Sequence, residues 1–225
     1  DAICNALLKR AVPLSRLHHG RLEPLATAGL VHERGRVGIV TAAHIFERAH
    51  WGDLAIPLPR DGRVARLHSA RVRLVIHPDN DVAILWIGHP SLAQRLCANW
   101  EASSMVGLTA ADTTPSTYVL VGYPACNAIR VDGCVFIKPL VLFTESIDAQ
   151  RYVYARTAER TDGMMIWTPE MDGVSGAMLW GISDEEDDDV ACVLRPAAIQ
   201  VAFTHSAHLR TESIACVLDL LNSSR

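Results

Sequence analysis

The stretch MDGVSGAMLWG, residues 171–181, places one serine between two glycines and then runs into apolar residues. Glycines around a polar residue are typical of a tight turn, and the apolar residues that follow predict a buried strand. Such a turn can also aim backbone N–H groups at a developing negative charge. Ser175 is therefore a candidate nucleophile, provided that the rest of the chain supplies a base and an acid.

The composition predicts a globular chain. Of 225 residues, 49% are hydrophobic and 20% are charged, which is typical of neither disordered nor membrane-embedded proteins. The net charge of -4 gives no reason to expect a nucleic-acid partner. No apolar run approaches the roughly 18 residues that span a bilayer, so we expect no membrane partner either. The six cysteines lack zinc spacing and predict buried free thiols in a reducing, cytoplasmic compartment.

Short apolar segments separated by Gly, Pro, Asn or Asp predict a chain of strands. They cover residues 30–31, 37–42, 72–76, 82–87, 118–121, 135–143, 152–155, 177–180 and 190–194. Helices are expected at 2–10 and at 211–222, where apolar residues recur at helical spacing. Many short strands with few helices indicate an all-β sandwich or barrel.

The stretch 101–116 is polar, rich in small residues, and divides the expected strands into two groups. We interpret it as the connection between two β lobes. The expected domains are residues 1–105, with the N-terminal region and the first lobe, and residues 106–225, with the linker, the second lobe and the C-terminal helix. The acidic run 184–189 is expected to be a solvated hairpin tip, since it lacks the glycine and the alternation of a calcium loop.

Two residues could activate Ser175, because a serine needs a base for its proton and a carboxylate to orient that base. His44, in VTAAHIF, follows an expected strand and has small alanines beside it. Asp81, in DVAILWI, opens an apolar strand, and a carboxylate at a core edge requires a partner. Asp79 is the alternative acid, but it lies farther from that strand. Taken alone, His44 is more simply interpreted as a half-buried histidine at a strand end.

Together, TAAHIF, DVAILWI and DGVSGAML resemble the three motifs of the chymotrypsin-like (trypsin-fold) serine proteases, in the order His44, Asp81, Ser175. The closest likeness is to the bacterial trypsin-like peptidases. It covers about residues 26–221 and implies an all-β fold of two six-stranded antiparallel β-barrels with a C-terminal α-helix. It also implies that His44 and Asp81 lie in the first barrel and Ser175 in the second.

The resemblance implies a serine endopeptidase that cleaves peptide bonds through an acyl-enzyme. Ser175 would attack the carbonyl, His44 would accept and return the proton, and Asp81 would fix the imidazole tautomer. The backbone N–H groups of Gly173 and Ser175 would form the oxyanion hole. This chemistry implies no metal and no other cofactor.

The resemblance leaves the substrate preference open. Zymogen-type members carry an aspartate at the position of Val174, so we expect no activation by a newly cut N-terminus. The base of the substrate pocket would be Pro169, where a trypsin-like enzyme carries an aspartate, and Glu170 lies close to it in sequence. Gln200 and Val201 would line the far wall.

The partners implied are a protein or peptide substrate and a regulatory protein that releases a latent site. The alternative is a catalytically inactive trypsin-fold binding module. An α/β-hydrolase esterase is disfavoured, because Ala177 interrupts its G-x-S-x-G motif and too few residues follow Ser175 to hold its later βα units.

Overall fold

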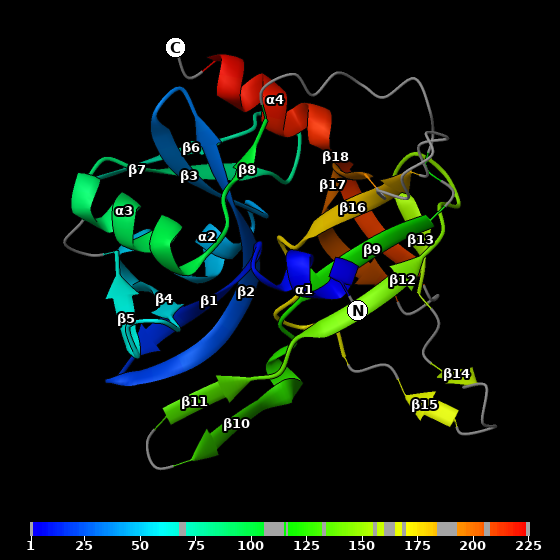
Figure 1. The fold of residues 1–225 in the computed structure, drawn as a ribbon, viewed down its shortest axis with the longest axis horizontal. Coiled ribbons are helices and arrows are strands. Elements are labelled where there is room, and N and C mark those ends of the chain that lie inside the picture. Colours follow the sequence, from blue (N-terminus) through cyan, green and yellow to red (C-terminus); the bar gives the residue numbers. More distant parts are fainter. Residues whose placement is uncertain are drawn as a thin grey trace.

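The computed structural model describes residues 2–67, 71–105, 115, 117–131, 134–154, 157–159, 165–167, 170–183, 193–204 and 208–223. Within them the expected all-β, chymotrypsin-like architecture with a C-terminal helix is confirmed (Figure 1). Three expectations lie outside the described residues: most of the linker, the acidic run 184–189, and Pro169 at the pocket base.

The first sheet has eight strands in the order β5-β4-β1-β2-β3-β7-β6, with β8 beside β2. Only the β2–β8 pairing is parallel. The strands are β1 (Ala11–His18), β2 (Arg21–Glu33), β3 (Arg36–Thr41), β4 (Leu54–Leu58), β5 (Arg63–Arg66), β6 (Val72–Ile76), β7 (Ala83–Ile87) and β8 (Ser103–Ser104). Because β8 falls within residues 101–116, the first part of the expected linker belongs to this sheet.

The second sheet has six strands in the order β12-β9-β16-β17-β18-β13, and two separate hairpins accompany it. Its strands are β9 (Thr117–Gly122), β12 (Leu140–Thr144), β13 (Arg151–Val153), β16 (Met178–Ser183), β17 (Val193–Thr204) and β18 (His208–Ser213). The hairpins are β10 (Ala128–Val131) with β11 (Cys134–Ile137), and β14 (Thr157–Glu159) with β15 (Met165–Trp167). The single strand expected at 135–143 is therefore two strands, separated at Pro139, which lacks an N–H for the ladder.

Helices α1 (Ala2–Leu8) and α4 (Ile214–Ser223) occur where the sequence predicts helices, although the last expected helix begins three residues later because 211–213 completes β18. The sequence analysis missed α3 (Pro90–Asn99), whose buried Leu92 and Leu96 follow a proline at its start. The remaining helical turns are α2 (Ile45–Arg48), η1 (Trp51–Asp53) and η2 (Ala125–Asn127). None of the described helices has the length and apolar character to cross a bilayer.

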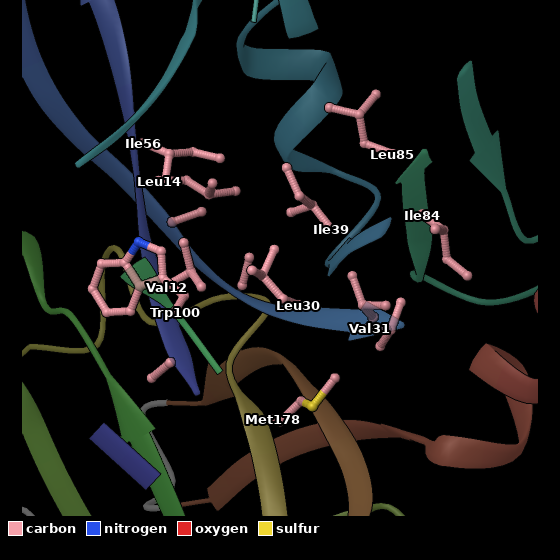
Figure 2. Close-up of a cluster of buried hydrophobic side chains, with 14 of the residues drawn as sticks. Val12, Leu14, Leu30, Val31, Ile39, Ile56, Ile84, Leu85, Trp100 and Met178 are labelled. Carbon is pink, nitrogen blue, oxygen red and sulfur yellow. The ribbon is translucent and has the colours of Figure 1, made fainter. Parts of the chain in front are cut away.

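The largest apolar core joins the two sheets. The largest share of its members comes from strands of the first sheet, and the second sheet contributes Val119, Val121, Met178, Trp180, Ile199 and Val201. In Figure 2 the Met178 side chain lies beside Leu30 and Val31 of β2. A Cβ on Gly29 would lie 2.7 Å from Met178 Cε, so the missing side chain lets β16 approach β2 closely. Since β16 starts soon after Ser175, this packing also places the serine.

The four cysteines whose side chains the structure describes are partly or fully exposed, which corrects the expectation of burial for these four. Cys97 and Cys126 are exposed, and both are free thiols, as are Cys4 and Cys216. Cys97 lies on α3, the helix that the sequence analysis missed, so its orientation toward solvent could not be inferred.

We predict that the core is intolerant at Ile39, which is 1% exposed on β3. Ile39→Ala is expected to lower the free energy of unfolding by about 2–5 kcal/mol, because it leaves a cavity in a packed interior. The control is Ile129→Ala on β10, where the side chain is 44% exposed, with an expected loss of less than about 1 kcal/mol. Urea unfolding measures both; equal losses would contradict this account of the core.

Candidate active site

The pairing of β3 with β7 brings His44 and Asp81 together. Thr41, the last residue of β3, pairs with Ala83, the first of β7, so the chain segments that carry the two side chains emerge side by side. His44 Nδ1 lies 2.6 Å from Asp81 Oδ2, and the His44 backbone N–H donates to Asp81 Oδ1 at 2.8 Å. Asp81 therefore holds both the ring and the backbone of His44.

The electrostatics of this pair favour a charged carboxylate. Burial raises the pKa of Asp81, but the hydrogen bonds from the His44 ring and backbone, together with the His44 charge, outweigh it and lower the pKa below its ordinary value of 3.8. Asp79, the alternative acid, instead donates its N–H to the ring of His77 at 3.2 Å. An open cavity of about 520 Å³ lies beside the pair, with Phe46 and Leu74 in its wall.

The serine lies in a turn at residues 172–176, which we call the serine turn. Gly173 and Gly176 both have φ of +91°, a conformation that residues with a side chain rarely adopt. A Cβ on Gly173 would lie 2.8 Å from the Tyr123 carbonyl oxygen. The N–H of Ala125, in η2, donates to the Asp172 carbonyl at 2.6 Å, so the entry to the turn is fixed from that side.

The backbone N–H groups of Gly173 and Ser175 have no acceptor among the described residues. The carbonyls of Asp172 and Val174, which precede Gly173 and Ser175, are both hydrogen-bonded. The Asp172 carbonyl accepts from the Ala125 N–H, and the Val174 carbonyl accepts from the Ala177 N–H at 2.9 Å. Because N–H and C=O point in opposite directions in a trans peptide, these bonds also fix the directions of the Gly173 and Ser175 N–H groups. Among the described residues neither N–H has an acceptor. The turn thus offers two backbone donors to an anion beside the Ser175 hydroxyl.

The serine turn packs directly on the strand that leads to His44. A Cβ on Gly176 would lie 2.0 Å from Thr41 Oγ1 and 2.2 Å from the Thr27 carbonyl oxygen. The Thr27 N–H also donates to the Ser175 carbonyl at 2.9 Å. The turn therefore contacts both β2 and the end of β3, and the three predicted triad residues gather at the junction of the two sheets.

The Ser175 hydroxyl is not joined to His44 by a hydrogen bond within the described part of the chain. Its Oγ donates instead to the Val201 carbonyl, over a long 3.5 Å. Hydrogen bonds to a catalytic serine are often long without substrate and shorten when substrate binds. The site thus consists of a hydrogen-bonded His–Asp pair and a serine hydroxyl whose long hydrogen bond goes to Val201.

The predicted pocket residues have different positions. Gln200 and Val201 lie on β17 next to the serine turn, and the Gly176 N–H donates to the Gln200 carbonyl at 2.7 Å. Gln200 is fully buried, and its amide has no partner among the described residues. Glu170 is exposed. In the described part of the chain, no group of three His, Cys, Asp or Glu side chains is placed to hold a metal ion.

Comparison with known proteins supports the fold and goes no further. No family model matches the chain, and no curated protein matches it. Among solved structures 265 chains match. One comes from work on how aromatic interactions drive the coupled folding and binding of the intrinsically disordered Sesbania mosaic virus VPg protein. It is 14% identical, with a TM-score of 0.52 over 93% of this chain and 89% of that chain, and at this identity the likeness is one of fold alone.

We predict that Gly176 cannot carry a side chain. Gly176→Ala is expected to cost more than the roughly 1–2 kcal/mol of left-handed backbone strain, since the new methyl collides with backbone atoms. Gly62→Ala is the control, because Gly62 has φ of +60° with nothing within 4 Å of the added Cβ. Urea unfolding of both variants gives the comparison, and equal costs would show that the turn yields to the methyl.

We predict that Asp81 stabilises the fold in a pH-dependent way. A carboxylate whose pKa is lowered by folding contributes stability that is fully present above about pH 4 and lost as the pH falls through the lowered pKa. Asp81→Asn should therefore destabilise the protein at neutral pH, and the gap to wild type should close in acid. Unfolding free energies from about pH 7 to about pH 3 test this. Asp79→Asn is the control; a gap for Asp81→Asn that stays constant with pH would contradict the prediction.

Proposed function

We propose that the chain is a serine endopeptidase of the chymotrypsin-like type, with His44, Asp81 and Ser175 as its triad. One observation carries this proposal: a hydrogen-bonded His–Asp pair and a serine turn with two unpaired backbone donors come together where the two sheets touch. The His–Asp pair alone, or the serine turn alone, could be explained as a structural feature. Their meeting is what acyl transfer requires, because the base and the oxyanion donors must flank one hydroxyl.

The reaction follows from these positions. The Ser175 oxygen bonds to the substrate carbonyl carbon while its proton passes to the free ring nitrogen of His44. The carbonyl oxygen becomes negative and accepts hydrogen bonds from the N–H groups of Gly173 and Ser175. The C–N bond then breaks as His44 returns the proton to the leaving amine. Water, activated by the same ring, cleaves the resulting ester and regenerates the serine. Asp81 stays ionised throughout and stabilises the imidazolium.

The resting site is latent in our proposal, because the hydroxyl faces Val201 rather than His44. A hydrogen bond of 3.5 Å is weak, so a rotation of the Ser175 side chain is inexpensive. A substrate or a reactive probe seated in the site supplies the small bias that turns the hydroxyl toward the ring, and a regulatory protein bound beside the site would increase that bias.

A binding module without catalysis is the second candidate, and the surface provides an observation in its favour. Phe136 and Phe143 are 59% and 53% exposed, so aromatic contacts are available to a protein partner. The structurally similar chain described above comes from work on aromatic-driven binding of a disordered protein. Chemical reactivity of Ser175 separates the two candidates, since a binding module needs none.

We predict that a fluorophosphonate probe labels the wild-type protein and that Ser175→Ala and His44→Ala abolish the labelling. The first variant lacks the nucleophile and the second lacks the base, and loss of either triad member typically lowers the rate by about 10,000-fold or more. Ser91→Ala is the matched control, because the exposed Ser91 hydroxyl hydrogen-bonds to His89, outside the candidate site; it should label like wild type. Mass spectrometry locates the adduct.

The result that contradicts this proposal is a folded wild-type protein that neither reacts with the probe nor hydrolyses peptide libraries. Labelling that survives in Ser175→Ala would equally exclude the assigned nucleophile. Either outcome would favour the binding module.

A further inference from the structure

Thr27 carries a buried hydroxyl that the proposed reaction does not use. It lies on β2 and is 0% exposed. Its Oγ1 donates to the Gly173 carbonyl at 2.8 Å and accepts from the Tyr123 N–H at 2.9 Å. The hydroxyl therefore joins the serine turn to the segment that leads into η2, across a separation of 146 residues between Thr27 and Gly173.

The backbone of Thr27 makes two further contacts with the site. Its N–H donates to the Ser175 carbonyl at 2.9 Å, and its carbonyl accepts from Thr41 Oγ1 at 2.9 Å. Thr41 ends β3, just before the segment with His44. One residue is thus bonded to the serine turn at two carbonyls and to the strand that delivers the base.

These contacts bear on the direction of the oxyanion donors. The carbonyls that Thr27 holds belong to Gly173 and Ser175, the residues whose N–H groups are unpaired. The N–H and the carbonyl of one residue belong to two successive peptide planes that meet at its Cα. Since each plane moves as a rigid unit, holding the carbonyl restricts the neighbouring plane that carries the N–H. With the Gly173 carbonyl released, the turn can rotate about the backbone bonds of that glycine, whose freedom is the greatest of any residue.

We propose that Thr27 is a positioning residue: its hydroxyl holds the Gly173 carbonyl and so, together with the bond from Ala125 to the Asp172 carbonyl, keeps the Gly173 N–H in the orientation that receives the oxyanion. Thr27 touches no reacting atom and acts through Gly173. The inference rests on the proposed function, because orientation of this donor matters for rate only where a carbonyl oxygen becomes negative beside it. It predicts that loss of the Thr27 hydroxyl slows the reaction of the folded protein, whereas loss of an ordinary buried hydrogen bond lowers only the free energy of unfolding.

The test substitutes Thr27 by valine, which replaces the hydroxyl with a methyl of similar size and leaves the backbone contacts. We expect the rate of fluorophosphonate labelling, and kcat on a peptide substrate, to fall about 10- to 100-fold, as for a small misplacement of a catalytic group or a weakened oxyanion donor. KM should change less than about 3-fold, because ground-state contacts lie elsewhere. The pH at half-maximal rate should not move, since the His44–Asp81 pair is untouched.

Two further variants separate positioning from structural support. Thr27→Ser keeps the hydroxyl and should react within about 3-fold of wild type. Thr144→Val removes another buried threonine hydroxyl. Thr144 is 5% exposed, and its hydroxyl donates to the Val153 carbonyl at 2.6 Å in the second sheet. It should lower stability without changing the labelling rate of the folded protein. Where Thr27→Val fails to fold, Thr27→Cys, with a weaker donor, replaces it and should show an intermediate rate.

Each outcome decides the matter. A folded Thr27→Val variant that labels at the wild-type rate overturns the inference while the proposed function stands. So does a rate loss that Thr144→Val shows to the same degree, because the effect would then follow stability. A wild-type protein that does not label overturns the proposed function, and this inference with it.

Discussion

Close contact between the serine turn and the first sheet is the constraint on which the site depends. Gly176 sits so near Thr41 and the Thr27 carbonyl that no side chain fits between them. The two sheets can meet at this distance only because the residue after Ser175 has no Cβ. A wider separation would move the hydroxyl away from His44 and break the bonds that Thr27 makes to the turn. The close contact at Gly176 therefore sets the distance between the serine turn and the first sheet, and the hydrogen bonds of the turn set its orientation.

The polar groups of the site differ in how they are satisfied. Asp81 accepts from the His44 ring and backbone, which keeps its charge stable despite partial burial. In the serine turn, by contrast, most carbonyls are bonded, while the N–H groups of Gly173 and Ser175 have no acceptor among the described residues. Unpaired donors near the interior are uncommon in folded proteins. The proposed oxyanion hole would give both of these donors a partner.

Much of the fold could be predicted, and the candidate site residues could be proposed, because the signals are local. His44, Asp81 and Ser175 each lie in a short motif beside an apolar strand, and strand patterning indicated the all-β class. Thr27 could not be found this way, since its proposed role comes from a contact with Gly173, 146 positions away. Helix α3 was missed because its apolar face is narrow, with only Leu92 and Leu96 buried. The division into domains at residue 105 stays a prediction, and the start of the expected linker forms β8 against β2.

The wide sequence separation within the site has a consequence for synthesis of the protein. His44 and Asp81 are made early, but the serine turn docks on β2 only after its residues have left the ribosome, and β17, which bonds to the turn, follows later still. Long-range contacts of this kind form slowly, and domains fold largely as units during translation. A nascent chain that has reached only His44 and Asp81 therefore lacks the proposed nucleophile. Any reactivity of the proposed triad requires synthesis at least through β17.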